Sequence, residues 1–230
     1  MKGYFTPGAP TTGGADAFNG TRPGTTVCYS NAGIGLLGAL VEIVSGQSLP
    51  DFTRQNIFEK VGMTRTSWRI ADYCDPGELA HGVRWSGDHF VPHDNGNFGQ
   101  PEGHPEIASG MLRSTAIDLA RFLLVMEADG ALPNGGRILS VTSARKLKRR
   151  QLDPGLPACP GSGASAAEQG LVWMYIPAGD GDWFGHYGGV NGFLSSFSYR
   201  VRDGLSLVLL MNTLDLTADM QLETDVLTHL

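Results

Sequence analysis

The 230-residue sequence lacks the features that mark several common protein classes. Cys28, Cys74 and Cys159 are odd in number and far apart, so they match neither a disulfide framework nor a zinc site. No apolar run is long enough to span a membrane, and the N-terminus has no apolar signal core. The net charge of −6 implies no general affinity for nucleic acid. These absences leave the compartment undecided.

Two site signatures are absent or incomplete. No Gly-x-Ser-x-Gly occurs, which disfavours an α/β-hydrolase. The run from Gly33 to Gly38 matches Gly-x-Gly-x-x-Gly, but no second strand ending in an acid follows it, so close helix packing explains these glycines better than nucleotide binding. Four histidines lie in a Pro/Gly-rich region without the spacing of metal ligands: His81, His89, His93 and His104. We therefore expect no metal and no other cofactor.

Composition indicates an ordinary globular protein, with 41% hydrophobic and 17% charged residues. The length is sufficient to bury a substantial core. We expect one domain over residues 1–230, made of a loop-rich lead (1–28), a mainly helical lobe (29–168), and an antiparallel sheet with a C-terminal helix (169–230). This arrangement is an α+β fold.

Helical signals dominate the first two thirds of the chain. Ser30 or Asn31 can cap a helix that runs to Ser45 and has Gly46 at its C-terminal end. Its apolar residues recur at helical spacing and are expected to be buried: Ile34, Leu37, Leu40, Val41 and Val44. Further helices are predicted over residues 48–60, 115–128 and 140–151. Residues 68–107 read as an irregular region, which is typical of a lid or the wall of a site.

The last third changes to a period of two. Strands are predicted over residues 171–176, 183–188 and 193–201. Asp203-Gly204 then predicts a two-residue hairpin turn into the segment from Leu205 to Met211. That segment is apolar on both faces, as in a buried strand. A helix over residues 216–227 closes the chain.

The stretch Tyr29-Ser30-Asn31 joins a short extended run to the first helix. The polar groups of Tyr29 and Asn31 therefore lie at the start of a helix, where the backbone holds them rigidly. This is a suitable place for a proton acceptor and a hydrogen-bonding amide, whereas Ser30 has a structural role. A packing tyrosine and a plain N-cap are the alternatives for the two outer residues.

Four sequence blocks in order carry a family resemblance. Pro-Gly-x-x-x-x-Tyr-Ser-Asn starts at Pro23, Gly-Met-Thr-Arg-Thr at Gly62, Ala-Ser-Gly-Met-Leu-Arg-Ser-Thr at Ala108, and Gly-His-Tyr-Gly-Gly at Gly185. Together they resemble the serine β-lactamase and penicillin-binding-protein superfamily, nearest to its class C β-lactamase, D-Ala-D-Ala carboxypeptidase and esterase branch. The resemblance implies hydrolysis of a small-molecule ester, amide or peptide through an acyl-enzyme.

The resemblance also implies roles for residues. Tyr29 would be the base or proton relay, which needs cationic neighbours because an unperturbed tyrosine pKa is about 10. Asn31 would hold the nucleophile's lysine or the substrate's amide. His186 stands where the family has the lysine of Lys-Thr-Gly. The strand residues that follow are assigned to the oxyanion and substrate: Gly188 allows close approach, Gly189 offers its N–H, and Tyr187 narrows the cleft.

The nucleophile expected from the resemblance is missing. The family's Ser-x-x-Lys lies well upstream of the tyrosine motif, but the first 28 residues contain no serine. The Ser143-x-x-Lys146 sequence comes after that motif, in a basic helix that solvation explains better. The chain is thus interpreted as the C-terminal part of a serine hydrolase, inactive by itself. The alternative is a non-catalytic relative that binds or scaffolds.

A missing upstream part would also leave the segment from Leu205 to Met211 as an open apolar edge. Such an edge pairs readily with another chain. We therefore expect either a complementing segment or chain, or self-association through this edge.

Overall fold

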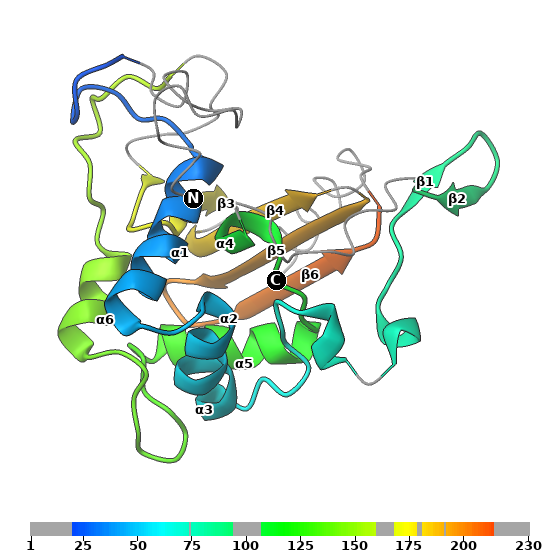
Figure 1. The fold of residues 1–230 in the computed structure, drawn as a ribbon. Coiled ribbons are helices and arrows are strands. Elements are labelled where there is room, and N and C mark those ends of the chain that lie inside the picture. The colour runs from blue at the N-terminus through cyan, green and yellow to red at the C-terminus, as the bar shows by residue number, and fades with distance from the viewer. Residues whose placement is uncertain are drawn as a thin grey trace.

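The computed structural model describes residues 20–73, 75–93, 107–159, 168–178, 181–190 and 192–213. Within them, helices pack beside a four-stranded antiparallel sheet of order β3-β4-β5-β6 (Figure 1). The strands are β3 (Met174–Ala178), β4 (Gly181–Val190), β5 (Phe193–Arg200) and β6 (Ser206–Met211). The predicted α+β class, with helices first and sheet second, is confirmed.

Helix α1 (Asn31–Ser45) begins and ends where the sequence predicts. The Ser30 hydroxyl accepts a hydrogen bond from the Gly33 N–H at 3.0 Å, so Ser30 is the N-cap. Gly46 adopts a left-handed conformation (φ 69°), which lets its N–H reach the Glu42 carbonyl at the C-terminal end.

The expected burial of this helix is wrong. Among its residues only Gly35 and Gly38 are buried, because the helix contacts its neighbours mainly through small residues. An added methyl group at Gly38 would lie 2.7 Å from the Ala108 Cβ, which shows how closely α1 approaches α4 (Ile107–Gly110). Most of the apolar residues on α1 remain exposed: Leu36, Leu37, Leu40, Ile43 and Val44.

The second predicted helix forms as three joined parts. These are α2 (Leu49–Thr53), a π-helical turn (Arg54–Phe58) and α3 (Glu59–Val61), and Gly62 ends the run at φ 80°. Ser48 caps its start by accepting from the Asp51 N–H at 3.2 Å. The first hydrophobic core lies beneath this run and consists of Leu49, Phe58, Met63, Trp68 and Met111.

Residues 68–93 contain more regular structure than expected. Short 3₁₀ turns occur at Ile70–Asp72 and Pro76–Glu78. The strands β1 (Val83–Trp85) and β2 (Phe90–Pro92) then form an antiparallel hairpin that projects away from the main sheet (Figure 1). The turn between them contains Gly87 at φ 79°, which is the signal that would have identified it. Residues 94–106 of the predicted irregular region lie outside the described residues.

Helix α5 (Ala116–Glu127) packs on β5 and β6, and α6 (Val141–Lys148) follows it. Both have hydroxyl caps, Thr115 and Ser140, at the first residues of the predicted helices. The second core lies between α5 and the sheet and contains Leu123, Met126, Trp173, Phe184 and Tyr199. Trp173 contacts several aromatic rings here, and its centroid lies 5.1 Å from that of Phe197.

Two boundaries in the sheet differ from the prediction. Strand β3 begins at Met174, after Val172, whose backbone has a φ of 85° and cannot continue a strand. The β5–β6 connection spans Val201 to Leu205 and is longer than a two-residue turn. In it the Arg200 guanidinium donates two hydrogen bonds of 2.9 Å to the Asp203 carboxylate, and Arg202 Nε donates a third at 3.4 Å. These hydrogen bonds lower the pKa of Asp203 to about 2.

The predicted helix over residues 216–227 lies outside the described residues. Strand β6 forms one edge of the sheet within the described part of the chain, as expected for the segment from Leu205 to Met211. Among the described residues no single helix is long and apolar enough to cross a membrane, although Asn31–Ser45 and Leu49–Val61, bent by 78°, meet the length and composition together.

Candidate active site

Tyr29 lies between two fixed pieces of backbone. On its N-terminal side, Val27 forms a parallel bridge with Ala158. On its C-terminal side, Ser30 caps α1. The Tyr29 side chain is itself 49% exposed, so its position depends on this backbone more than on packing.

His186 approaches Tyr29 from the sheet. It lies on β4, opposite Phe197 of β5, and on the same face as Phe184 of the second core. The centroids of the Tyr29 and His186 rings are 6.2 Å apart, with their planes inclined at 39°. The structure thus brings these two rings together, although their sequence positions are far apart.

The tautomer of His186 follows from its hydrogen bond. Its Nδ1 atom contacts the backbone carbonyl of Tyr187. A carbonyl can only accept, so Nδ1 carries the hydrogen. In the neutral imidazole the remaining nitrogen, Nε2, is then an acceptor for a proton or a hydrogen bond.

The rest of the predicted strand site lies along an uncovered part of β4. Strand β3 pairs with β4 only as far as Gly185, so His186 to Val190 have no β3 partner among the described residues. Tyr187, Gly188 and Gly189 are exposed there, while β5 pairs with them on the other side. Alternate main-chain N–H and C=O groups of such an edge are directed away from the paired side.

Asn31 is the first residue of α1 and is exposed. It therefore lies two residues from Tyr29, at the end of the helix where free N–H groups are found. A third block of the resemblance reaches the same region, because α4 contacts both α1 and β4. There an added methyl group at Gly110 would lie 3.4 Å from the Val190 side chain.

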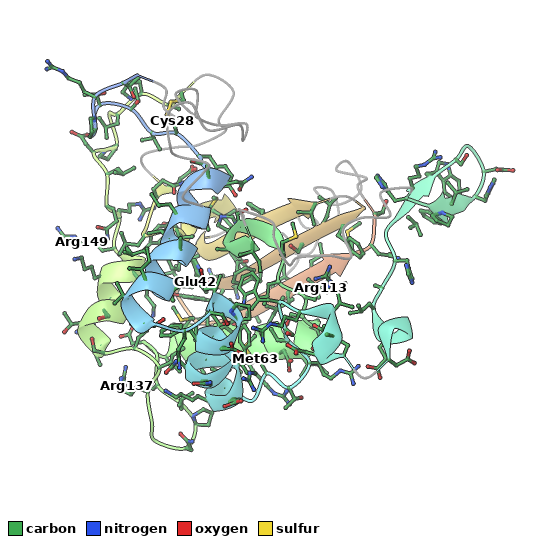
Figure 2. The ribbon with its side chains drawn as sticks, viewed as in Figure 1. Cys28, Glu42, Met63, Arg113, Arg137 and Arg149 are labelled. Atoms are coloured by element: carbon green, nitrogen blue, oxygen red, sulfur yellow. A yellow bond between two sulfur atoms is a disulfide. The ribbon has the colours of Figure 1, made fainter. Side chains whose placement is uncertain are left out.

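A disulfide next to Tyr29 corrects the sequence interpretation. Cys28 is bonded to Cys159, with Cα atoms 5.1 Å apart (Figure 2). The interpretation failed because connectivity cannot be read from three cysteines in one sequence. Cys74 lies outside the described residues.

The Gly-Met-Thr-Arg-Thr block has a structural role instead of a place at the two rings. Asp118 of α5 is buried and accepts from the Arg65 N–H at 2.7 Å and from the Thr66 hydroxyl at 2.9 Å. Its other carboxylate oxygen accepts from the Arg121 guanidinium at 2.9 Å. One carboxylate thus ties this block to the helix below it.

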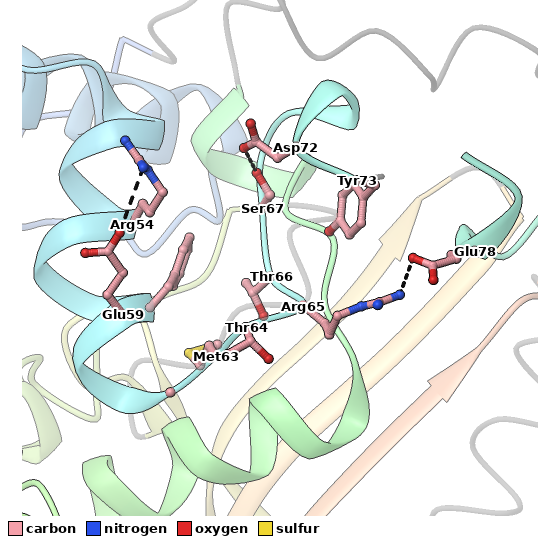
Figure 3. Close-up of a pocket in the computed structure, with 12 residues that line it drawn as sticks. Arg54, Glu59, Met63, Thr64, Arg65, Thr66, Ser67, Asp72, Tyr73 and Glu78 are labelled. Atoms are coloured by element: carbon pink, nitrogen blue, oxygen red, sulfur yellow. Dashed lines mark hydrogen bonds and ion pairs between the residues drawn. The ribbon is translucent and has the colours of Figure 1, made fainter. Parts of the chain in front are cut away.

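A pocket of about 480 Å³ lies beside that block and apart from Tyr29 and His186 (Figure 3). Its charged walls pair with one another, as Arg65 does with Glu78 and Arg54 with Glu59. None of the predicted site residues lines it. We therefore locate the candidate active site at the two rings and not in this pocket.

Comparison with known proteins decides the family. The Beta-lactamase family model matches residues 4–229. The chain belongs to the beta-lactamase family. Penicillin-binding protein 4 of Amycolatopsis lactamdurans is 27% identical over 223 residues, which is 86% of this chain and 50% of that protein. The chain therefore spans about half the length of this curated relative.

Solved beta-lactamase-type structures share the fold at low identity. D-amino acid amidase from Ochrobactrum anthropi SV3 matches with a TM-score of 0.69 and 22% identity, over 91% of this chain and 60% of that one. The octameric penicillin-binding protein homologue from Pyrococcus abyssi matches with a TM-score of 0.66 and 23% identity, over 84% and 40%. As a beta-lactamase family member, the chain has hydrolase-type relatives.

Proposed function

We propose that this chain supplies part of the site of a serine hydrolase that acts on an ester, amide or peptide through an acyl-enzyme. The observation that carries the proposal is the contact between Tyr29 and His186 beside an uncovered strand edge. Acyl transfer needs a base, donors for the oxyanion and an activated hydroxyl. This chain offers candidates for the base and for the oxyanion donors.

In this proposal Tyr29 is the base or proton relay. His186 is its proposed partner in proton transfer, since the centroids of the two rings lie 6.2 Å apart. The fixed tautomer leaves Nε2 of His186 to exchange the proton. Asn31 would orient the nucleophile's lysine or a substrate amide from the start of α1.

The uncovered edge of β4 is the proposed substrate strand. The Gly189 N–H would be an oxyanion donor, and Gly188 would let substrate approach the backbone. Tyr187, which is 38% exposed, would narrow the cleft. The amidase and penicillin-binding-protein relatives support an amide or peptide substrate, and an ester is chemically equivalent for the same attack.

Ser143 is a poor candidate for the nucleophile. Its N–H and hydroxyl both bond to the Ser140 cap, at 3.0 and 2.9 Å, on the exposed start of α6. Helix α6 lies away from the N-terminal end of α1, where Tyr29 is found (Figure 1). The alternative function is a non-catalytic binding protein with this fold.

The test combines ligand binding with covalent labelling of the 230-residue chain. We expect D-phenylalanine amide or penicillin to shift the ¹³C-histidine NMR signal of His186, and Tyr29→Ala to weaken that binding at least tenfold. A fluorophosphonate probe, mapped by mass spectrometry, should leave Ser143 unlabelled. The matched control is Phe90→Ala, in the hairpin that projects from the sheet.

Three results would contradict the proposal. If neither ligand moves the His186 signal, the site assignment is wrong. A fluorophosphonate adduct at Ser143 would overturn the dismissal of that serine. Turnover of nitrocefin or a p-nitrophenyl ester that survives substitution of every serine would exclude the serine mechanism, whereas binding with turnover lost in one serine variant would reject the non-catalytic alternative.

We further propose that the exposed apolar stripe on α1, formed by Leu36, Leu37, Leu40, Ile43 and Val44, is covered in the working protein by polypeptide corresponding to the relatives' unmatched half. Ile43 and Val44 are 77% and 78% exposed, and the stripe is continuous along the helix. Continuous apolar surface of this kind marks an interface. The relatives' extra length supports this occupant.

Without that covering polypeptide, the chain should self-associate. The penicillin-binding protein homologue from Pyrococcus abyssi, which has a similar fold, is octameric. We expect light scattering to give a mass above 24.5 kDa that rises with concentration. The double variant Ile43→Lys/Val44→Lys should lower it, whereas Phe90→Lys, an equally apolar exposed site on the β1–β2 hairpin, should not. If the double variant leaves association unchanged and only substitutions in β6 abolish it, the open sheet edge is the contact. If the wild-type chain remains monomeric at high concentration, neither the α1 stripe nor the β6 edge is an association surface.

A further inference from the structure

The backbone immediately before Tyr29 is held by more than one bond. The Val27 N–H donates to the Pro157 carbonyl at 2.9 Å, and the Cys159 N–H donates to the Val27 carbonyl at 2.8 Å. The Cys28–Cys159 disulfide closes the same contact covalently, between residues 131 positions apart. Residues 157–159 thus hold the backbone immediately before Tyr29 in place.

The backbone immediately after Tyr29 is fixed as well. Ser30 is bound into α1 through its side chain, to the Gly33 N–H, and through its carbonyl, to the Ile34 N–H at 3.2 Å. Tyr29 is therefore the single residue between two anchors. Because the backbone of one residue has only two soft dihedral angles, two anchors closely determine the direction of its Cα–Cβ bond. Its own packing cannot do so, since half of the side chain is exposed.

We propose that the Cys28–Cys159 disulfide is a positioning device for Tyr29. In the oxidised protein it holds the phenol against His186, and reduction loosens that contact. A dithiol reductant breaks the S–S bond, passes two electrons to it and becomes a disulfide itself, while Cys28 and Cys159 each take a proton and become thiols. Two backbone hydrogen bonds then remain as the N-terminal anchor.

The catalytic consequence of this inference rests on the proposed function, but the ring contact does not. If Tyr29 is the base or relay, the reduced protein retains the residue in a poorer position, which lowers kcat more than it changes KM. A disulfide that only stabilised the fold would lower the melting temperature and leave the two rings in contact. The geometry of the rings therefore separates the two roles without any turnover.

The experiment follows the ¹³C-labelled histidine rings by NMR, at a temperature well below unfolding, before and after dithiothreitol. Thiol titration should show a gain of two thiols. The His186 signal, assigned with His186→Gln, should move by more than the largest change at His81, His89 or His93, which serve as internal controls. Cys28→Ser/Cys159→Ser should reproduce the reduced spectrum, and Cys74→Ala should reproduce the oxidised one.

A Tyr29→Ala variant completes the design. It removes the phenol, so its oxidised spectrum should already show a displaced His186 signal, and reduction should add no further displacement. If reduction moves His186 equally in Tyr29→Ala, the disulfide acts on the histidine by another route and the inference is wrong. It is also wrong if the wild-type signal stays fixed after both thiols appear. If Cys28→Ser/Cys159→Ser does not fold, the comparison of the oxidised with the reduced wild-type chain still tests the inference. Failure of this test leaves ligand binding at His186, and hence the hydrolase proposal, standing.

Discussion

Asp118→Ala should destabilise the protein by about 3–5 kcal/mol, because it removes a buried carboxylate that accepts three hydrogen bonds, and hydrogen bonds to a charged group are worth about 1.5–3 kcal/mol each. The carboxylate is 1% exposed and accepts hydrogen bonds from the Arg65 N–H, the Thr66 hydroxyl and the Arg121 guanidinium. Alanine removes the acceptor of the Arg65 N–H, while the Thr66 hydroxyl and the Arg121 guanidinium keep only their bonds to Ser114 and the Gly62 carbonyl. Each buried donor left unpaired costs about 1–3 kcal/mol.

Urea unfolding followed by tryptophan fluorescence and by circular dichroism would measure this loss. Trp68, Trp173 and Trp183 are buried, so fluorescence reports on both lobes. Asp88→Ala is the matched control, because the Asp88 side chain is 89% exposed and pairs only with the neighbouring His89. That control should change stability by less than about 0.5 kcal/mol. A loss below about 1 kcal/mol for Asp118→Ala would mean that the carboxylate does not hold the two elements together.

Gly185→Ala should cost about 3 kcal/mol, or prevent folding, because strand β4 has no room for a methyl group at this position. An added Cβ would lie 2.0 Å from the Phe197 carbonyl oxygen and 2.6 Å from the Ser198 Cα. Both atoms belong to the backbone of β5, which cannot rotate away as a side chain would. The β4–β5 spacing would have to open next to His186.

The matched control for this substitution is four residues along the same strand. At Gly189 an added methyl group meets only the Leu194 side chain, at 3.3 Å, and that side chain can adjust. Gly189→Ala should therefore change the free energy of unfolding by less than about 1 kcal/mol, since alanine lowers the entropy of the unfolded chain. Equal losses at Gly185 and Gly189 would show that strand propensity, and not the clash, sets the cost.

The parts of the fold that were predictable from the sequence depend on local signals. Ser30, Ser48, Thr115 and Ser140 each cap a helix where a hydroxyl precedes a helical pattern. Capping involves residues only two or three positions apart, so one sequence contains all the necessary information. The meeting of Tyr29 and His186 is not local, and it was predicted only through a family resemblance.

The predictions that proved wrong concern contacts whose partners the sequence does not specify. The burial of α1 was predicted from its own periodicity, but burial also needs a neighbour, and Ile43 and Val44 have none among the described residues. The pairing of Cys28 with Cys159 depends on the path of the whole chain between them. The late start of β3 depends on the backbone of Val172, which has a positive φ despite a β-branched side chain that disfavours it.

The half-paired state of β4 has one more consequence. From His186 onward the strand has no β3 partner among the described residues, and its main-chain groups recur at a regular spacing that does not depend on which side chains it carries. Under the proposed function, a substrate lying along it would be selected by its length and by the handedness of its backbone. Substitutions at Tyr187 would then change which substrate side chains are accepted. They would leave the selection of backbone handedness unchanged, so the two kinds of selectivity could evolve separately.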